Sequence, residues 1–99
     1  MSADDYVIEL VAFVNPANLL GPYRELAASH LGRYVVRYDP RAVRSEDQLV
    51  STDDPDQALG FPTAAKATAC WRTEVGIRAD GKPNRPLTAY TVTIARRPT

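Results

Sequence analysis

The chain has 99 residues, of which 44% are hydrophobic and 24% charged, the proportions of an ordinary globular protein, and we expect a single α+β domain over residues 1–99. No segment approaches the roughly 20 apolar residues of a membrane span, and the N-terminus carries two Asp and no basic residue, unlike a signal peptide. With one cysteine, Cys70, no internal disulfide can form, so we expect a cytoplasmic protein without membrane contact.

The net charge is zero, but the charges are unevenly spread along the chain. Residues 1–60 hold five Arg against ten acidic residues, and residues 61–99 hold seven basic residues against two acidic ones. Such a division favours a polyanionic partner or head-to-tail association, unless the fold interleaves the two halves.

The first half of the chain predicts two strands and a helix. Residues 6–14, YVIELVAFV, are β-branched and aromatic with one polar residue, which indicates a central strand. A helix is expected to begin at Pro22 and to end at Gly32, where a left-handed residue is favoured. Residues 33–39 alternate as a half-exposed strand, with one face formed by Tyr34, Val36 and Tyr38.

The second half predicts a weak strand, a helix and a strong strand. Residues 41–48 are a polar connection, residues 49–52 could form a short strand, and residues 53–60 resemble one helical turn capped by Asp54. Residues 62–74 are alanine-rich and favour a helix, although residues 73–79 could instead belong to a strand. Residues 87–95 alternate clearly, with Tyr90, Val92 and Ile94 on one face.

This order predicts a small antiparallel or mixed sheet with two helices on one face, in the βαββαβ, split β-α-β (ferredoxin-like) arrangement. The helices would leave the other sheet face open. Strand 6–14 would present apolar side chains there, either Val7, Val11 and Phe13 or Tyr6, Ile8, Leu10 and Val14. An open apolar face requires a second subunit, a ligand or another partner.

The segment GIRADGKP, residues 76–83, spells most of a phosphate-binding loop. Such a loop ends in Ser or Thr, follows a strand and opens a helix, but here Pro83 removes both the hydroxyl and a backbone donor. We therefore interpret it as a turn at Asp80-Gly81, stiffened by the prolines that follow. The candidate ligand-binding residues are this basic loop and its flank: Arg72, Arg78, Lys82 and Arg85.

The remaining polar residues do not form a recognisable catalytic or metal-binding set. Cys70 is expected to be a buried small hydrophobe, and His30 to lie in the last turn of the first helix. The Asp cluster at residues 53–56 lacks the spacing of a calcium loop and is explained by helix capping. No catalytic residue, metal or cofactor is therefore assigned.

Three functions remain open. The first is a small non-enzymatic module that binds a protein partner or itself as a homodimer. The second is nucleic-acid or phosphate binding through the basic C-terminal region. The third is a small-molecule enzyme of the dimeric α+β barrel type, with His30, Tyr34 or Tyr38 as acid/base candidates.

Overall fold

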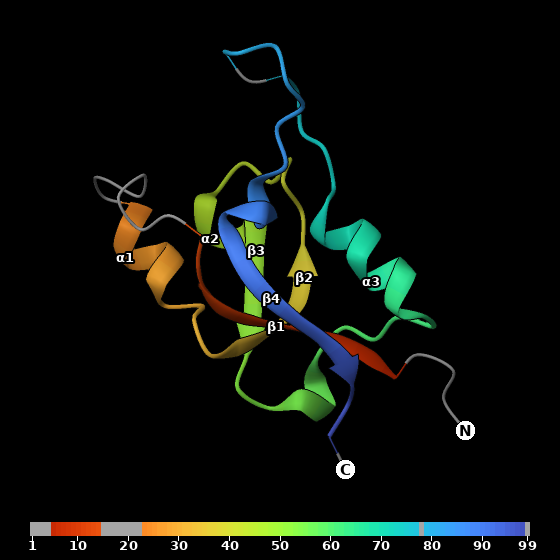
Figure 1. Cartoon of the computed structure of the whole chain (residues 1–99). Coiled ribbons are helices and arrows are strands. Elements are labelled where there is room, and N and C mark those ends of the chain that lie inside the picture. Colours follow the sequence, from red (N-terminus) through yellow and green to blue (C-terminus); the bar gives the residue numbers. More distant parts are fainter. Residues whose placement is uncertain (1–4, 15–22, 78, 99) are drawn as a thin grey trace.

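The computed structural model describes residues 5–14, 23–77 and 79–98. Within them, four strands form one antiparallel sheet in the order β3-β2-β1-β4 (Figure 1). The strands are β1 (Tyr6–Phe13), β2 (Arg33–Tyr38), β3 (Leu49–Thr52) and β4 (Tyr90–Arg96). The helices are α1 (Tyr23–Ala28), α2 (Ser45–Gln48) and α3 (Ala64–Trp71), with short 3-10 helices at Pro55–Gln57 and Pro86–Ala89.

The α+β class is confirmed, but the ferredoxin-like strand order is not. That order places another strand between β1 and β2, whereas here the two are neighbours, with Glu9 opposite Tyr34. The reason lies in the connection, because α1 is short and the chain turns back at Gly32. The N–H of Gly32 donates to the carbonyl of Leu10 at 2.7 Å, and its φ of 77° is one that only glycine adopts easily. The chain therefore reverses directly beside β1.

A β-bulge in β1 decides which of its apolar residues enter the core. The register with β4 shifts between Leu10 and Ala12, so alternation is interrupted and Phe13 joins Ile8 and Leu10 in the core. Val7 is also nearly fully buried. Neither predicted open-face set is therefore left intact, and only Val11 and Val14, at the end of the strand, stay substantially exposed.

A second bulge corrects the predicted faces of β2. The register with β3 shifts between Val35 and Arg37, so the expected common face of Tyr34, Val36 and Tyr38 is wrong. Val35 is instead fully buried, and Tyr38 packs against the same core. Sequence alternation alone cannot reveal such an inserted residue.

Residues 59–61 fill the gap where β1 and β2 separate. The N–H of Leu59 donates to the carbonyl of Val35 at 2.9 Å, and Tyr6 and Phe61 exchange two backbone hydrogen bonds of 3.1 and 2.8 Å. These bonds satisfy backbone groups that would otherwise lie unpaired between diverging strands.

The helices α1 and α3 contribute to one core on the sheet. Thr63 caps α3 by accepting from the N–H of Lys66, and Ala67 is fully buried. The Trp71 indole N–H donates to the carbonyls of Leu87 and Tyr90, at 2.9 and 3.2 Å. The Tyr90 hydroxyl in turn donates to the carbonyl of Ala27 on α1 at 2.9 Å, which ties that helix to β4.

Several local predictions are confirmed. Residues 49–52 form a strand, Asp54 caps the turn that follows by accepting from the N–H of Asp56, and Tyr90, Val92 and Ile94 of β4 share the core face.

Other local predictions need correction. The polar connection 41–48 contains α2, and α3 ends at Trp71, so residues 73–77 belong to neither helix nor regular strand. The expected helix start at Pro22 lies outside the described residues.

Candidate functional site

A hairpin formed by Val75–Asn84 projects away from the sheet and helices (Figure 1). Its two arms are joined at the base, where the N–H of Val75 donates to the carbonyl of Asn84 at 2.7 Å and the N–H of Asn84 donates to that of Gly76 at 3.1 Å. Ile77 and Pro83 face each other across the arms. The side chain of Ile77 is 78% exposed, so the hairpin carries an apolar group out into solvent.

The conformation of the hairpin explains the glycine-lysine segment. Gly76 and Gly81 have φ values of 68° and 84°, and the Asp80 carboxylate accepts from the N–H of Lys82 at 3.0 Å. The segment does not follow a strand and does not open a helix, both of which a phosphate-binding loop requires. Its glycines serve the backbone path of a hairpin.

The predicted basic loop residues are only partly brought together. Lys82 is exposed on the hairpin, whereas Arg85 lies at its base and forms an ion pair with Glu74 at 2.7 Å. Arg72 is exposed at the C-terminal end of α3, where its N–H donates to the carbonyl of Thr68. Arg78 lies outside the described residues.

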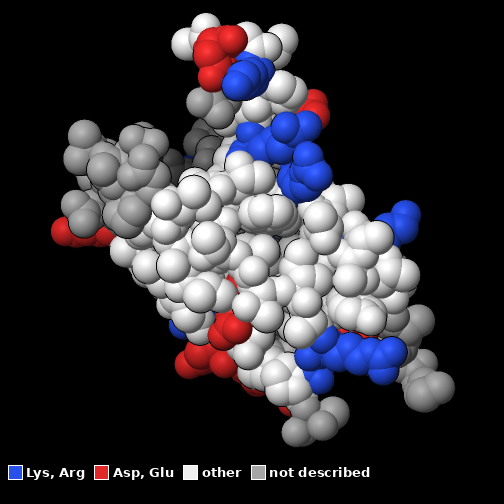
Figure 2. Space-filling model, viewed as in Figure 1, with Lys and Arg blue, Asp and Glu red and all other residues white. Residues whose placement is uncertain are grey.

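The basic residues at the C-terminal end of β4, Arg96 and Arg97, are engaged within the molecule. The Arg96 guanidinium lies 5.8 Å from the centre of the Tyr6 ring, and Arg97 donates to the carbonyls of Pro55 and Ala58. On the face shown in Figure 2, basic side chains lie on and below the hairpin and again near the C-terminal end, with mostly uncharged surface between them. This face does not carry one continuous basic patch.

An open cleft of about 490 Å³ lies where α1, the end of β2, α2 and the base of the hairpin meet. The side chains of the described residues that line it are mainly apolar, and none of these is Lys, Arg, Asp or Glu. They are Leu26, Ala27, His30, Tyr38, Pro40, Gln48, Leu49, Val75, Asn84, Pro86, Leu87 and Tyr90. The volume is within the range of pockets that hold small organic ligands, roughly 300–1,000 Å³. Of the three acid/base candidates, the structure therefore brings His30 and Tyr38 to one cleft and leaves Tyr34 outside it.

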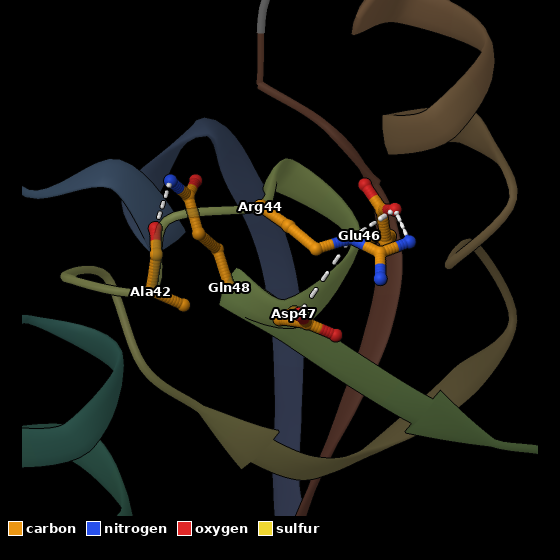
Figure 3. Close-up of polar contacts among 5 residues, drawn as sticks. All are labelled: Ala42, Arg44, Glu46, Asp47 and Gln48. Atoms are coloured by element: carbon orange, nitrogen blue, oxygen red, sulfur yellow. Dashed lines mark hydrogen bonds and ion pairs between the residues drawn. The ribbon is translucent and has the colours of Figure 1, made fainter.

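Three polar side chains in the cleft have distinct environments. The Tyr38 hydroxyl is buried and has no hydrogen-bond partner among the described residues. Burial, with a smaller contribution from nearby Cys70, raises the pKa of Tyr38 to about 12. The Gln48 amide nitrogen donates to the carbonyl of Ala42 at 3.1 Å, which fixes the amide and leaves its oxygen as the available atom (Figure 3). The same figure shows Arg44 paired with Glu46 and Asp47 beside it.

His30 belongs to a polar cluster at the edge of the cleft. Its Nδ1 lies 2.6 Å from the Ser51 hydroxyl, which also accepts from Arg33 Nε at 3.0 Å. Partial burial, and then the Arg33 charge, lower the pKa of His30, which favours the neutral ring; the tautomer decides whether Nδ1 donates to the Ser51 hydroxyl or accepts from it. No carboxylate among the described residues forms a hydrogen bond to the ring. We therefore interpret the cluster as a tie between α1 and the edge strand β3.

Sequence reasoning missed Ser51 and Gln48. Ser51 reaches His30 across 21 residues, and nothing in its neighbourhood distinguishes it from any other strand serine. Gln48 ends a four-residue helix that the polar composition of residues 41–48 concealed.

The other candidates behave as structural groups. Cys70 packs against the core, and burial raises the pKa of its thiol, which keeps it protonated. Within residues 5–14, 23–77 and 79–98, no three His, Cys, Asp or Glu side chains are grouped so that they could hold a metal ion. In the same part of the chain, no helix has the length and hydropathy needed to cross a membrane.

Comparison with known proteins found no match: no family model fits the chain, and neither a curated protein nor a solved structure is similar to it.

Proposed function

We propose that this chain is a small non-enzymatic protein-binding module whose partner is contacted by the hairpin Val75–Asn84. The observation that carries the proposal is Ile77, an apolar side chain 78% exposed on a projecting, hydrogen-bonded hairpin. Transferring such a side chain from water to an apolar pocket contributes roughly 1.5–3 kcal/mol to a complex. An exposed apolar side chain at a projecting position is therefore well placed to be a binding anchor.

The construction of the hairpin supports the same function. Two backbone hydrogen bonds, the Arg85–Glu74 ion pair and the Asp80–Lys82 turn hold its arms before any partner arrives. A loop that is ordered in advance loses less conformational entropy on binding than a flexible one. Lys82, exposed on the same hairpin and adjacent in sequence to Pro83, adds a positive charge, which favours a partner pocket that is apolar at its centre and acidic at its rim.

Site-specific photo-crosslinking tests this proposal. A photoreactive p-benzoylphenylalanine replaces Ile77 in cells that naturally produce the chain, and the matched control carries it at Val43, which is fully exposed on another segment. We expect one discrete adduct from position 77 and none from position 43. An adduct of two chain masses would show self-association, and equal or absent adducts at both positions would refute the proposal.

Binding with the purified partner then gives the energetic test. We expect Ile77→Asp to weaken the complex at least tenfold, about 1.4 kcal/mol, because the anchor becomes charged. Lys82→Glu should slow association and reduce its salt dependence. Unchanged affinity in both variants would place the interface elsewhere.

Nucleic-acid binding, the second hypothesis, is less favoured by the geometry. Arg85 is paired with Glu74, and Arg97 donates to backbone carbonyls, so these two groups are already engaged. Fluorescence anisotropy with single-stranded DNA and RNA of about 20 nucleotides tests it. Affinity that falls steeply as salt rises would replace the present proposal.

The third hypothesis, a dimeric enzyme, would use His30 and Tyr38 in the cleft. A tyrosine whose pKa is about 12 is a poor general base near neutral pH, and His30 Nδ1 is already engaged in a hydrogen bond with the Ser51 hydroxyl. These groups are better suited to bind than to transfer protons.

A further inference from the structure

We propose that the cleft between α1, α2 and the base of the hairpin is a binding site for an uncharged small molecule with an apolar body and a hydrogen-bonding group. The inference does not depend on the protein-binding function, because the tip of the hairpin lies outside the cleft and only its base residues Val75 and Asn84 form part of the wall.

The first argument is the composition of the walls. Side chains from helix, strand and hairpin converge there, and the apolar ones include Leu26, Leu49 and Leu87. Among the described residues no Lys, Arg, Asp or Glu lines the cleft, and the shifted pKa values keep His30 and Tyr38 neutral near pH 7. A charged ligand would lose its hydration without gaining an ion pair, so the walls select against it.

The second argument is the Tyr38 hydroxyl. A buried hydroxyl without a partner costs about 1–3 kcal/mol, and native proteins keep few such groups. Tyr38 is half-buried and lines the cleft, so its hydroxyl is a candidate partner for a ligand bound there. A ligand carbonyl, hydroxyl or amide would supply the missing hydrogen bond.

The third argument is the set of atoms beside Tyr38. His30 Nδ1 is hydrogen-bonded to the Ser51 hydroxyl, so Nε2 is the ring nitrogen left for a ligand, and it donates or accepts according to the tautomer. The Gln48 amide is oriented by the hydrogen bond from its nitrogen to the carbonyl of Ala42, and its oxygen is an acceptor. Polar groups at fixed places within a largely apolar wall give orientation to a small ligand.

Two fluorescent probes with the same aromatic framework test the charge preference. N-phenyl-1-naphthylamine is uncharged, and 8-anilinonaphthalene-1-sulfonate adds one sulfonate to that framework. We expect the uncharged probe to bind saturably with one site per chain, and the sulfonate to bind at least tenfold more weakly. Absence of saturable binding by the uncharged probe, or equal affinity for both, would overturn the proposal.

Cleft-filling variants locate the binding. Leu26→Trp and Pro40→Trp each place an indole into the cleft from a different wall, so one remains informative if the other is unstable. We expect each folded variant to weaken probe binding at least tenfold, whereas Val43→Trp, on an exposed segment outside the cleft, should leave it unchanged. Binding that survives both cleft substitutions would refute the assignment.

Two further variants separate the role of the Tyr38 hydroxyl in ligand binding from the role of Ile77 in binding a protein partner. Tyr38→Phe should keep the thermal midpoint or raise it, because it removes a buried hydroxyl without a partner, and it should reduce affinity two- to tenfold for the uncharged probe. Ile77→Asp should leave probe binding unchanged, so that loss of the protein partner and loss of the small molecule remain distinguishable. A lowered midpoint in Tyr38→Phe with unchanged probe affinity would show that the hydroxyl is structural and would contradict its role in binding.

Discussion

The sheet and the hairpin show two different ways in which this chain uses apolar side chains. In the sheet, Ile8, Leu10 and Val35 are fully buried and contact residues from distant parts of the chain. In the hairpin, Ile77 is mostly exposed and lies opposite Pro83 on the other arm. The first group stabilises the fold, and the second contributes little to it.

This contrast has a physical basis in how each region is held. The core is stabilised because apolar area is removed from water when the chain folds. The hairpin is held by backbone hydrogen bonds, the Arg85–Glu74 ion pair and glycine conformations, each of which contributes little stability in water. An exposed apolar side chain on such a hairpin is removed from water, and so becomes stabilising, only when another molecule covers it.

The largest expected effect is the difference in unfolding free energy between a truncated side chain in the sheet and one in the hairpin. Leu10→Ala should lower the free energy of unfolding by about 2–5 kcal/mol, because it leaves a cavity in a fully buried site. Ile77→Ala should change it by less than about 0.5 kcal/mol. Urea denaturation of both variants measures this, and a large loss of stability in Ile77→Ala would erase the distinction between the regions.

Glycine substitutions test the same comparison through the backbone. Gly32 and Gly81 both have positive φ, and a Cβ at either position would meet no atom within 4 Å, so alanine introduces backbone strain alone. Gly32→Ala should cost about 1 kcal/mol of global stability, since its N–H bonds to β1. Denaturant unfolding measures this loss.

Gly81→Ala should leave global stability unchanged and loosen only the hairpin. Hydrogen exchange at the amides of Val75 and Asn84 should accelerate about fivefold, the factor that corresponds to roughly 1 kcal/mol. Equal global destabilisation by both glycine variants would indicate that the hairpin folds together with the core.

The smallest expected effect concerns pH. The folded state lowers the pKa of His30 below its ordinary value of 6.5, so the unfolded chain binds more protons there. The corresponding stability is present above pH 6.5 and is lost as pH falls through the lower folded pKa. Because the ring is only partly buried, we expect a loss of about 0.5 kcal/mol or less.

Urea denaturation at pH 8, 7 and 6 checks this dependence. His30 is the only histidine in the chain, so His30→Gln provides a direct control. The variant should show a flatter profile over this range. An identical slope in both proteins would show that the protonation of His30 does not affect folding.

Local features were predictable because they depend on neighbouring residues. The apolar content of residues 6–14 and the alternation of residues 87–95 predicted strands, Asp54 predicted a cap, and Asp80-Gly81 predicted a turn. The sequence also predicted that residues 76–83 are not a phosphate-binding loop, because Pro83 removes a hydroxyl and a backbone donor that such a site requires.

Strand order and the candidate cleft were not predictable in the same way. A bulge inserts one residue without any mark in composition, so alternation placed Val36 instead of Val35 on the same face as Tyr38. The cleft joins Leu26, Tyr38 and Asn84, which lie far apart in the chain. Their proximity depends on the tertiary arrangement, which includes the antiparallel β1–β2 pairing. That long-range pairing could not be predicted from a single sequence.

By itself, the amino-acid sequence determined an α+β composition, the ends of several elements and the turn at Asp80-Gly81, because propensity, capping and turn chemistry act over a few residues. The tertiary structure alone decided the β3-β2-β1-β4 order, the pairing of Arg85 with Glu74 and the meeting of His30 with Ser51. These contacts form because segments far apart in the sequence bury apolar surface against one another. The free energy of that burial depends on how the whole chain packs, and no single segment determines it.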